Sequence, residues 1–481
     1  MHANPMSRST VHPHILVLVA LLALSSCVPA WKVREARRDV PATFGVAPDS
    51  VSSAATPWSL FHSDPDLRAL IDTALANNQE LNILLQEIEV LRNEARARKG
   101  EYLPFVGFTA GAGIEKAGEH TRNGAVERSL SIAEDTPFPE PLTDLGFGLR
   151  ASWELDVWKR FRNARKAATL RYLGGIEGRN FMVTNLVAEI ANSYYELLAL
   201  DAQMAILRAN IAIQQDALEV VKLEKEAAKV TELAVRRFEA EVLKNRSDLF
   251  DIQQRIVETE NRINFLVGRY PQPVQRASAG ALDLVPAAVS SGRPADLLTH
   301  RPDIRRAELE LDAAKLDVRS ARACFYPSVG ITAGFGFNAF DAALLLESPA
   351  SLVYSVAGDL VAPLVNRNAI KAMYATANAR QLQAVHAYER TVLTATVEVM
   401  NQLSRVANLE NSYALRTQQV DALGASITIS GNLFRSARAD YMEVLLTQRD
   451  ALESRFELVE TRKQRMNAMV DLYQALGGGW K

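Results

Sequence analysis

Two stretches of this chain nearly repeat each other: Arg96–Gly113 reads RARKGEYLPFVGFTAGAG, and Arg319–Gly336 reads RSARACFYPSVGITAGFG. The residues that recur 223 positions later include Pro104, Val106, Gly107, Thr109, Ala110, Gly111 and Gly113. A second match pairs Val183–Leu218 with Val392–Ile427 at an offset of 209 positions, so the later copy is about 14 residues shorter between the matches. The sequence therefore predicts a tandem duplication of one structural unit.

The repeated stretches open a region in which apolar residues alternate with small or polar ones. The alternation covers Phe105–Gly113 and Leu145–Asp156 in the first copy, and Val329–Asn338 and Leu352–Leu360 in the second. Half-apolar strands of about ten residues have the length that crosses a bilayer when tilted. A soluble β-sandwich is the alternative interpretation. It needs more strands than these four, because a second sheet must cover the apolar face.

Four strands cannot close a barrel, and an open sheet edge in lipid leaves backbone groups without hydrogen bonds. Closure therefore requires several chains. Two chains would give eight strands and three would give twelve. A barrel of about eight strands is filled by its own side chains, whereas a wider one holds water. The small residues on the polar faces favour the wider barrel and hence three chains.

Long helices with heptad spacing follow each pair of strands. The outgoing seams are Val183, Ile190, Leu197, Met204, Ile211 and Leu218, and Val392, Val399, Val406, Tyr413, Val420 and Ile427. The returning seams include Val235, Val242, Leu249, Ile256 and Ile263, and Leu445, Leu452, Val459, Met466 and Tyr473. A strict seven-residue repeat predicts coiled-coil packing. A helix from Trp158 to Leu223 would reach about 100 Å at 1.5 Å per residue.

The N-terminus carries a targeting segment. Its apolar run Ile15–Leu24 is too short to span a bilayer and is typical of a signal peptide. Leu24-Ser25-Ser26-Cys27 resembles a bacterial lipobox, which predicts cleavage before Cys27 and a covalent lipid on it (N-acyl and S-diacylglycerol). An ordinary secretory signal cut near Ser26 is the alternative. Cys324 then has no intrachain partner and is expected to be a small apolar filler.

These patterns predict an order of segments along the chain. They are a lipoprotein signal peptide (1–26), a lipid-anchored tether (27–63), a first repeat (64–270) and a linker (271–297), then a second repeat (298–481). The first repeat contains a leading helix with a possible break at Asn77-Asn78, a β-hairpin at about 103–156 and a helical hairpin at about 157–268. The second contains the same parts, with the β-hairpin at about 326–362 and the helical hairpin at about 364–476.

Composition excludes several other functions. The formal charge is −2 with 23% charged residues, so the chain has no basic surface for nucleic acid. We find no glycine-rich phosphate loop, no Gly-x-Ser-x-Gly and no metal-spaced cluster, so an enzyme and a metal site are not expected. A periplasmic adaptor lipoprotein is a further alternative, but it needs a single coiled-coil hairpin rather than a duplication with membrane-type strands.

Short motifs in a specific order resemble the TolC-like outer-membrane factor family, in its lipoprotein branch. They are Trp153-Glu154-Leu155-Asp156, His300-Arg301-Pro302-Asp303-Ile304, Phe325-Tyr326-Pro327-Ser328, Pro363-Leu364-Val365-Asn366-Arg367 and Ala475-Leu476-Gly477-Gly478-Gly479-Trp480. The resemblance implies an α+β membrane protein. Three chains would form a 12-stranded transmembrane β-barrel continued by a periplasmic 12-helix coiled-coil α-barrel with a mixed equatorial belt.

The same resemblance implies a function. The homotrimer would passively conduct drugs and other toxic compounds through the outer membrane, taking them from an inner-membrane pump of the resistance-nodulation-division type and a periplasmic adaptor. A type I secretion exit duct and a heavy-metal efflux channel are the alternatives within the family.

The resemblance also implies a gate at the periplasmic tip, near the second helix reversal. Met442 matches a position that is commonly an apolar ring, and Arg449 one that often links neighbouring helices. Leu446 stands where an aspartate is usual, which leaves Glu443 as the nearest acid for cation selectivity. A solvated pair on a helix face is the alternative for Glu443 and Arg449. The paired reversals Lys229-Val230-Thr231 and Arg438-Ala439-Asp440 are the candidate adaptor-docking turns, with Thr231 and Asp440 as helix N-caps.

Overall fold

A computed structural model describes residues 33–45, 52–133, 135–276, 286, 288–363, 365–436 and 438–481. The predicted signal peptide, Cys27 and the first part of the tether lie outside the described residues. The chain forms two compact units. The strand unit takes Val90–Tyr172, Glu310–Val385 and the described residues 33–35. The helical unit takes Ala36–Glu89, Leu173–Leu309 and His386–Lys481. Each unit contains residues of both repeats, so neither repeat forms a separate compact unit.

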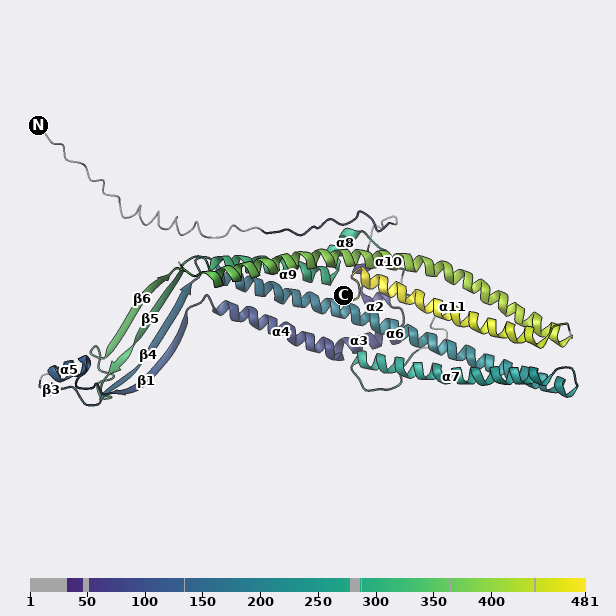
Figure 1. The fold of residues 1–481 in the computed structure, drawn as a ribbon, viewed down its shortest axis with the longest axis horizontal. Coiled ribbons are helices and arrows are strands. Elements are labelled where there is room, and N and C mark those ends of the chain that lie inside the picture. The colour runs from purple at the N-terminus through teal and green to yellow at the C-terminus, as the bar shows by residue number, and fades with distance from the viewer. Residues whose placement is uncertain are drawn as a thin grey trace, which may run out of the picture. The chain divides into compact units, whose positions relative to one another are not determined.

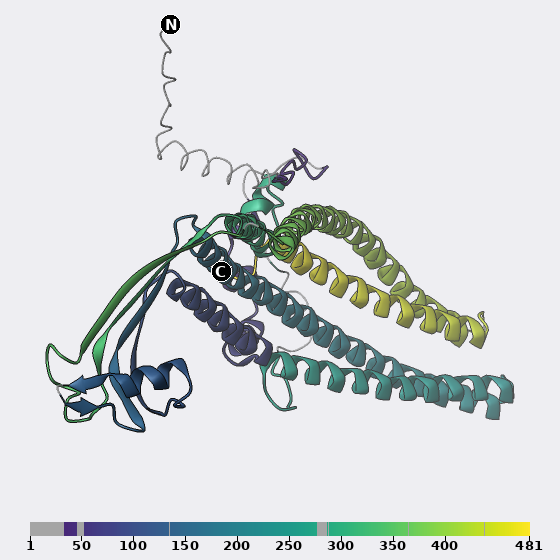
Figure 2. The ribbon, with the colours of Figure 1, turned by 60° about the vertical axis from the view of Figure 1, so that its left-hand side comes forward.

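The strand unit is built on one antiparallel sheet (Figures 1 and 2). Its strands, in the order β1-β4-β5-β6, are Phe105–Glu115, Leu142–Leu155, Ser328–Ala339 and Leu352–Val361. These bounds confirm the four predicted alternating stretches. The connection from β1 to β4 also contains α5 (Arg122–Ser129) and the short pair β2 (Ser131–Ala133) and β3 (Thr136–Pro137), which the sequence pattern did not predict.

The register of the sheet keeps the two predicted faces separate. On the apolar face, Phe108 lies opposite Leu149, which lies opposite Phe335, which lies opposite Tyr354. On the other face, Thr109, Gly148 and Gly336 form one row. Since side chains alternate along each strand, a slip of one residue would mix the faces.

Two glycines are required where β4 and β5 meet. A Cβ on Gly148 would lie 2.6 Å from the Phe335 carbonyl oxygen and 2.7 Å from the Gly336 Cα. A Cβ on Gly336 would collide in the same way with the Phe147 oxygen and the Gly148 Cα. Both contacts are with backbone atoms, which cannot move away as a flexible side chain could. Only glycine therefore fits at these two paired positions.

The leading helix is broken as predicted. α3 (Pro65–Asn77) begins at Asp64, whose carboxylate accepts from the Asp66 amide at 2.8 Å. α4 (Gln79–Gly100) begins after Asn78. The Asn78 side chain accepts from the Leu81 amide at 2.9 Å and donates to the Leu266 carbonyl at 2.8 Å. The buried side-chain amide of Asn78 therefore caps the start of α4 and ties it to Leu266, while the Asn78 backbone amide bonds to the last turn of α3.

Two long helical hairpins supply most of the helical unit (Figure 2). The first is α6 (Arg160–Glu226) with α7 (Glu232–Val267), and the second is α10 (Asn368–Arg435) with α11 (Tyr441–Ala475). The predicted seam of the first hairpin is buried: Ile190, Leu197 and Ile263 have no exposed surface. In the second hairpin the buried seam residues are Val392 and Val399, at the start of the outgoing seam, and Met466 and Tyr473, at the end of the returning seam.

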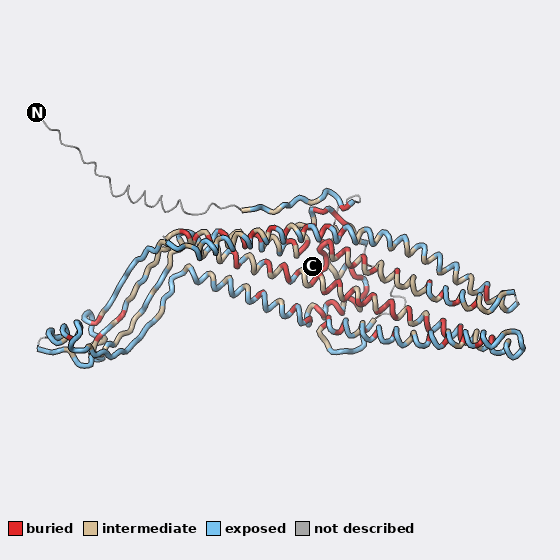
Figure 3. The backbone as a smooth tube through the Cα atoms, viewed as in Figure 1, coloured by how far each residue is buried: buried red, intermediate tan, exposed pale blue. Residues whose placement is uncertain are grey.

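Shorter elements complete the described part of the chain. They are η1 (Ser53–Ala55), α2 (Trp58–Phe61), α8 (Pro294–His300) and α9 (Pro302–Ala323). Figure 3 shows buried residues in runs along the helices, whereas the strands are mainly intermediate or exposed. No helix in the described ranges combines the length and the apolar character needed to cross a membrane.

Candidate functional site

Each helical hairpin ends in a tight reversal that exposes polar residues. At the first reversal, Lys229 and Thr231 are exposed and Val230 is half-buried. At the second, Arg438 and Asp440 are exposed and Ala439 is half-buried. Thr231 and Asp440 occupy the N-cap positions as predicted, but neither side chain accepts a capping hydrogen bond. The side chains of Thr231 and Asp440 therefore do not cap the helices that they precede.

An apolar cluster joins the tips of the two hairpins. Val221, Ala234, Val235 and Phe238 of the first hairpin are buried. Phe434, Tyr441 and Leu445 of the second hairpin pack against them, as does Val230. The two reversals therefore pack against each other through apolar side chains, and Val230 is one of these side chains.

Met442 lies at this junction. The Arg237 guanidinium of α7 approaches its sulfur, with Nη1 at 2.8 Å from Sδ. A thioether is a weak acceptor, so this contact can separate at small energetic cost. Of the four predicted gate residues, Met442 is the one that meets the other hairpin through a polar contact.

Glu443 and Leu446 share a different environment. They line a surface hollow of about 390 Å³ between α10 and α11, together with Thr447 and Asp450. The α10 wall is Ser426, Ile429, Ser430 and Leu433. The hollow therefore combines an exposed apolar surface with two carboxylates.

Arg449 belongs to neither environment. Its guanidinium lies 3.6 Å from the carboxylate of its neighbour Asp450, and both side chains are about half exposed. Surface pairs of this kind contribute less than about 1 kcal/mol. Glu443 and Arg449 are both exposed on α11, as the solvated alternative expects, although Arg449 pairs with Asp450 rather than with Glu443.

Asp450 and Arg237 were not singled out from the sequence. A heptad reading could have found Asp450, because it stands seven residues after Glu443 and four after Leu446. These three residues form one stripe of α11, and Met442 and Arg449, also seven apart, form the adjacent stripe. The contact of Arg237 had no sequence signal, since it joins residues 205 positions apart.

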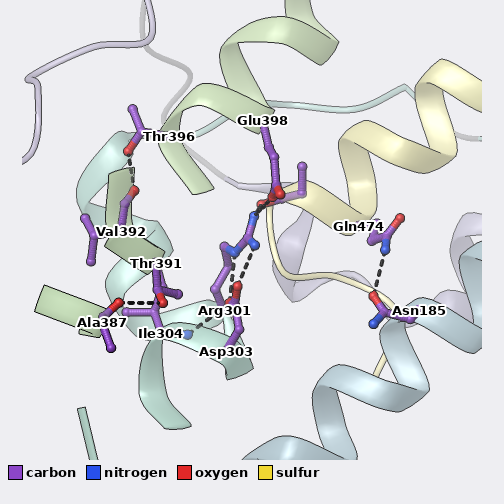
Figure 4. Close-up of polar contacts among 11 residues, drawn as sticks. Asn185, Arg301, Asp303, Ile304, Ala387, Thr391, Val392, Thr396, Glu398 and Gln474 are labelled. Atoms are coloured by element: carbon purple, nitrogen blue, oxygen red, sulfur yellow. Dashed lines mark hydrogen bonds and ion pairs between the residues drawn. The ribbon is translucent and has the colours of Figure 1, made fainter. Parts of the chain in front are cut away.

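A second polar cluster surrounds Arg301, at the break between α8 and α9 (Figure 4). Its guanidinium donates to both Asp303 carboxylate oxygens, at 3.0 and 2.6 Å, and to Glu398 at 2.7 Å. It also donates to the Ala475 carbonyl at 2.9 Å, at the end of α11. Burial by itself would lower the pKa of Arg301, but the bonds and charges of Asp303 and Glu398 more than offset it and raise that pKa.

This cluster has a structural role. Arg301 is 5% exposed, and its fork binds one carboxylate on two sides, as only arginine does. The His300–Ile304 motif thus attaches the start of the second repeat to α10 and to the C-terminal end of α11. In the described residues, no group of three or more His, Cys, Asp or Glu side chains is arranged to hold a metal ion.

The helix-rich α+β fold, the duplicated hairpins and the apolar-faced sheet agree with comparison to known proteins. The chain belongs to the outer membrane efflux protein family, which matches residues 70–269 and 294–478. It is therefore an outer-membrane channel protein of an efflux system. Members of this family are channels, in agreement with the prediction that the chain is not an enzyme.

Individual relatives match over nearly the whole chain. The pyoverdine export outer membrane protein OpmQ of Pseudomonas putida is 26% identical, over 98% of this chain and 98% of its own. The cation efflux system protein CusC of Escherichia coli is 25% identical, over 97% and 99%. The open state of the Neisseria gonorrhoeae MtrE outer membrane channel matches the fold with a TM-score of 0.83 at 23% identity, covering 95% of this chain and 99% of MtrE.

Proposed function

We propose that three copies of this chain form a continuous conduit, with twelve strands crossing the outer membrane and twelve helix segments extending into the periplasm. The observation that carries the proposal is the sheet itself. Its two edge strands, β1 and β6, each have one unpaired edge, and nearly all of their residues on both faces are exposed. Apolar side chains such as Phe108 and Val356 are more than 60% exposed on one face. Pairing β6 of one copy with β1 of the next satisfies the edges, and lipid covers the apolar face.

The opposite face supports three copies rather than two. It carries glycine, serine and threonine, and a hollow of about 650 Å³ lies over it. Such small side chains would leave an eight-stranded barrel poorly filled, whereas they leave a twelve-stranded barrel open to water.

The gate lies at the tip of the second hairpin. In the closed state, Arg237 contacts Met442, and the stripe of Glu443, Leu446 and Asp450 lines the constriction. The weak Arg237–Met442 contact allows α10 and α11 to move outward when the hairpins of a periplasmic adaptor dock at the two reversals. Glu443 and Asp450 supply the acidic lining that Leu446 lacks.

The inner-membrane pump selects the cargo. Relatives of similar identity are named for pyoverdine, toluene and cation efflux, so the channel scaffold serves chemically different substrates. We assign small-molecule export to this chain with an adaptor and a pump as partners, and a diacylglycerol-modified Cys27 as its anchor.

Reconstitution in planar bilayers tests the proposal. We expect the solubilised protein to have the mass of three chains and to conduct ions. Replacing Met442 and Arg237 by alanine is expected to raise the open probability, because it removes the contact between the hairpins. The combined change Glu443→Ala with Arg449→Ala is also expected to alter conductance.

Arg236→Ala is the matched control for the tip. Arg236 precedes Arg237 but forms ion pairs within its own hairpin, with Glu232 and Glu239, both at 2.9 Å. Its removal should leave the open probability unchanged. A mass of one or two chains would refute the trimer, and unchanged conductance in both combined variants would refute the gate.

A further inference from the structure

Arg150 is the one basic residue in the four strands of the sheet. It lies in the middle of β4 (Leu142–Leu155), on the face that carries the glycines. The register places Gly107 opposite it on β1 and Gly334 opposite it on β5. Neither facing residue has a side chain, so only backbone atoms of β1 and β5 lie beside Arg150 on this face. Arg150 is exposed.

The acids of this face are Glu115 and Asp144 toward one end and Glu154 and Asp359 toward the other. Asp144 accepts a hydrogen bond from Asn338 at 2.7 Å, near one end of β4. Glu154 pairs with Arg160 at 2.9 Å, near the other. At about 3.3 Å per residue along a strand, these carboxylates start about 20 and 13 Å from Arg150. No residue that the structure describes forms an ion pair with Arg150.

The space above Arg150 is open. Arg150, Asn338 and Ser355 line the 650 Å³ hollow together with the glycines of three strands. A side chain that only filled a barrel would pack against large side chains on the neighbouring strands. Arg150 has no such neighbour, because the residues that face it on β1 and β5 are glycines. A positive charge without a partner attracts anions from the water over the sheet.

We propose that Arg150 makes the strand region of the channel selective for anionic solutes. The inference rests on the proposed three-chain closure, which brings three Arg150 side chains to the same height of one lumen. Arg150 is the one cation of the four strands, and the acids of this face lie about 13 Å or more along the strands from its row, so the ring supplies the positive potential at mid-height. The solutes that it favours carry carboxylate, phosphate or sulfonate groups.

The field of such a ring depends on salt. The Debye length is about 30 Å at 10 mM and about 3 Å at 1 M ionic strength. At low salt, one unit charge in water raises the local concentration of a monovalent anion about two-fold at 10 Å. At high salt the same charge acts only on ions that touch it. A selectivity caused by Arg150 must therefore fade as salt is raised.

Reversal potentials of reconstituted channels across a KCl gradient test the proposal. With 10 and 30 mM KCl on the two sides, Arg150→Gln is expected to lower the ratio of chloride to potassium permeability at least about two-fold. Arg150→Glu is expected to lower it further, and Arg150→Lys to restore the wild-type ratio. With 1 and 3 M KCl, the difference between the wild type and Arg150→Gln is expected to vanish.

The variants are compared in the wild-type channel and with the tip changes Met442→Ala and Arg237→Ala. Glu443 and Asp450 at the tip are unchanged in both backgrounds. Within each background, the Arg150 variants therefore differ only in the strand region. An unchanged permeability ratio in a conducting trimer with Arg150→Gln would overturn the assignment of Arg150 alone. A shift in Arg150→Lys as large as in Arg150→Gln would show that shape rather than charge matters. Absence of conducting trimers in every variant would overturn the proposed function and this inference with it.

Discussion

At the scale of single residues, His62 makes the stability of the helical unit sensitive to pH. It is 1% exposed, and neither ring nitrogen has a hydrogen-bond partner. Burial lowers the pKa of His62 from 6.5 to about 4. Above pH 6.5 the ring is neutral in both the folded and the unfolded chain. Below that value the unfolded chain takes up a proton first, so stability falls until the pH reaches the folded pKa.

The expected loss between pH 6.5 and 4 is up to about 3 kcal/mol, since one pKa unit corresponds to about 1.4 kcal/mol. Melting temperatures of the purified protein at pH 4.5 and 7.5 measure it. His62→Leu is expected to lose less stability on acidification than the wild type. His386→Gln, which changes a side chain that is 61% exposed, should retain the wild-type difference. Equal pH dependence of the wild type and His62→Leu would contradict the assignment.

Arg301 makes the strongest residue-scale prediction for the fold. Arg301→Ala removes a buried cation, leaves Asp303 with only the bond from the Ile304 amide, and takes the Arg301 donor from the Ala475 carbonyl. It is expected to destabilise the protein by about 3 kcal/mol or more. Arg301→Lys should recover only part of this, because it lacks the planar fork. Arg262→Ala breaks the exposed pair with Glu189, whose atoms lie 2.8 Å apart, and should cost less than about 1 kcal/mol. A similar fall in melting temperature for Arg301→Ala and Arg262→Ala would refute the anchoring role.

At the scale of secondary-structure elements, the pairing of Gly148 on β4 with Gly336 on β5 is the point of the sheet most sensitive to substitution. Gly148→Ala places a methyl carbon within 2.7 Å of backbone atoms of β5, so the strands must separate there. We expect a large fall in the amount of folded trimer in the membrane, measured by native gel. Gly111→Ala is the control on the same face, because a Cβ there meets no atom within 4 Å. Normal trimer levels in Gly148→Ala would show that the two strands are less closely paired than described.

The elements also show how far the sequence could be interpreted. Alternation located all four strands and heptads located all four long helices, because both patterns report local periodicity. The insertion with α5 and the β2–β3 pair was missed, since its eight-residue helix and very short strands have too few residues for a period. The Arg237–Met442 contact was missed because it depends on how two hairpins pack, which no local pattern encodes.

At the scale of the whole molecule, the proposed three-chain closure makes one chain incomplete as a channel. The exposed apolar face and the unpaired edges of β1 and β6 need neighbours and lipid, so single chains released from the membrane should aggregate. If Cys27 carries lipid, Cys27→Ser should lack the added acyl mass and be retained less firmly on membranes during carbonate washing. Mass spectrometry of the mature chain checks the first expectation directly. An unmodified wild-type Cys27 would leave the ordinary secretory signal as the correct interpretation.

The sequence alone determined the duplication, the two kinds of element and the faces that they present, because residue order fixes periodicity and periodicity fixes faces. Only the tertiary structure decided how the copies combine. It showed that each compact unit draws on both repeats, that Glu443, Leu446 and Asp450 share one hollow while Met442 meets Arg237, and that Arg150 stands alone among glycines. These arrangements arise from contacts between residues far apart in the chain, where packing and charge in three dimensions outweigh any local preference.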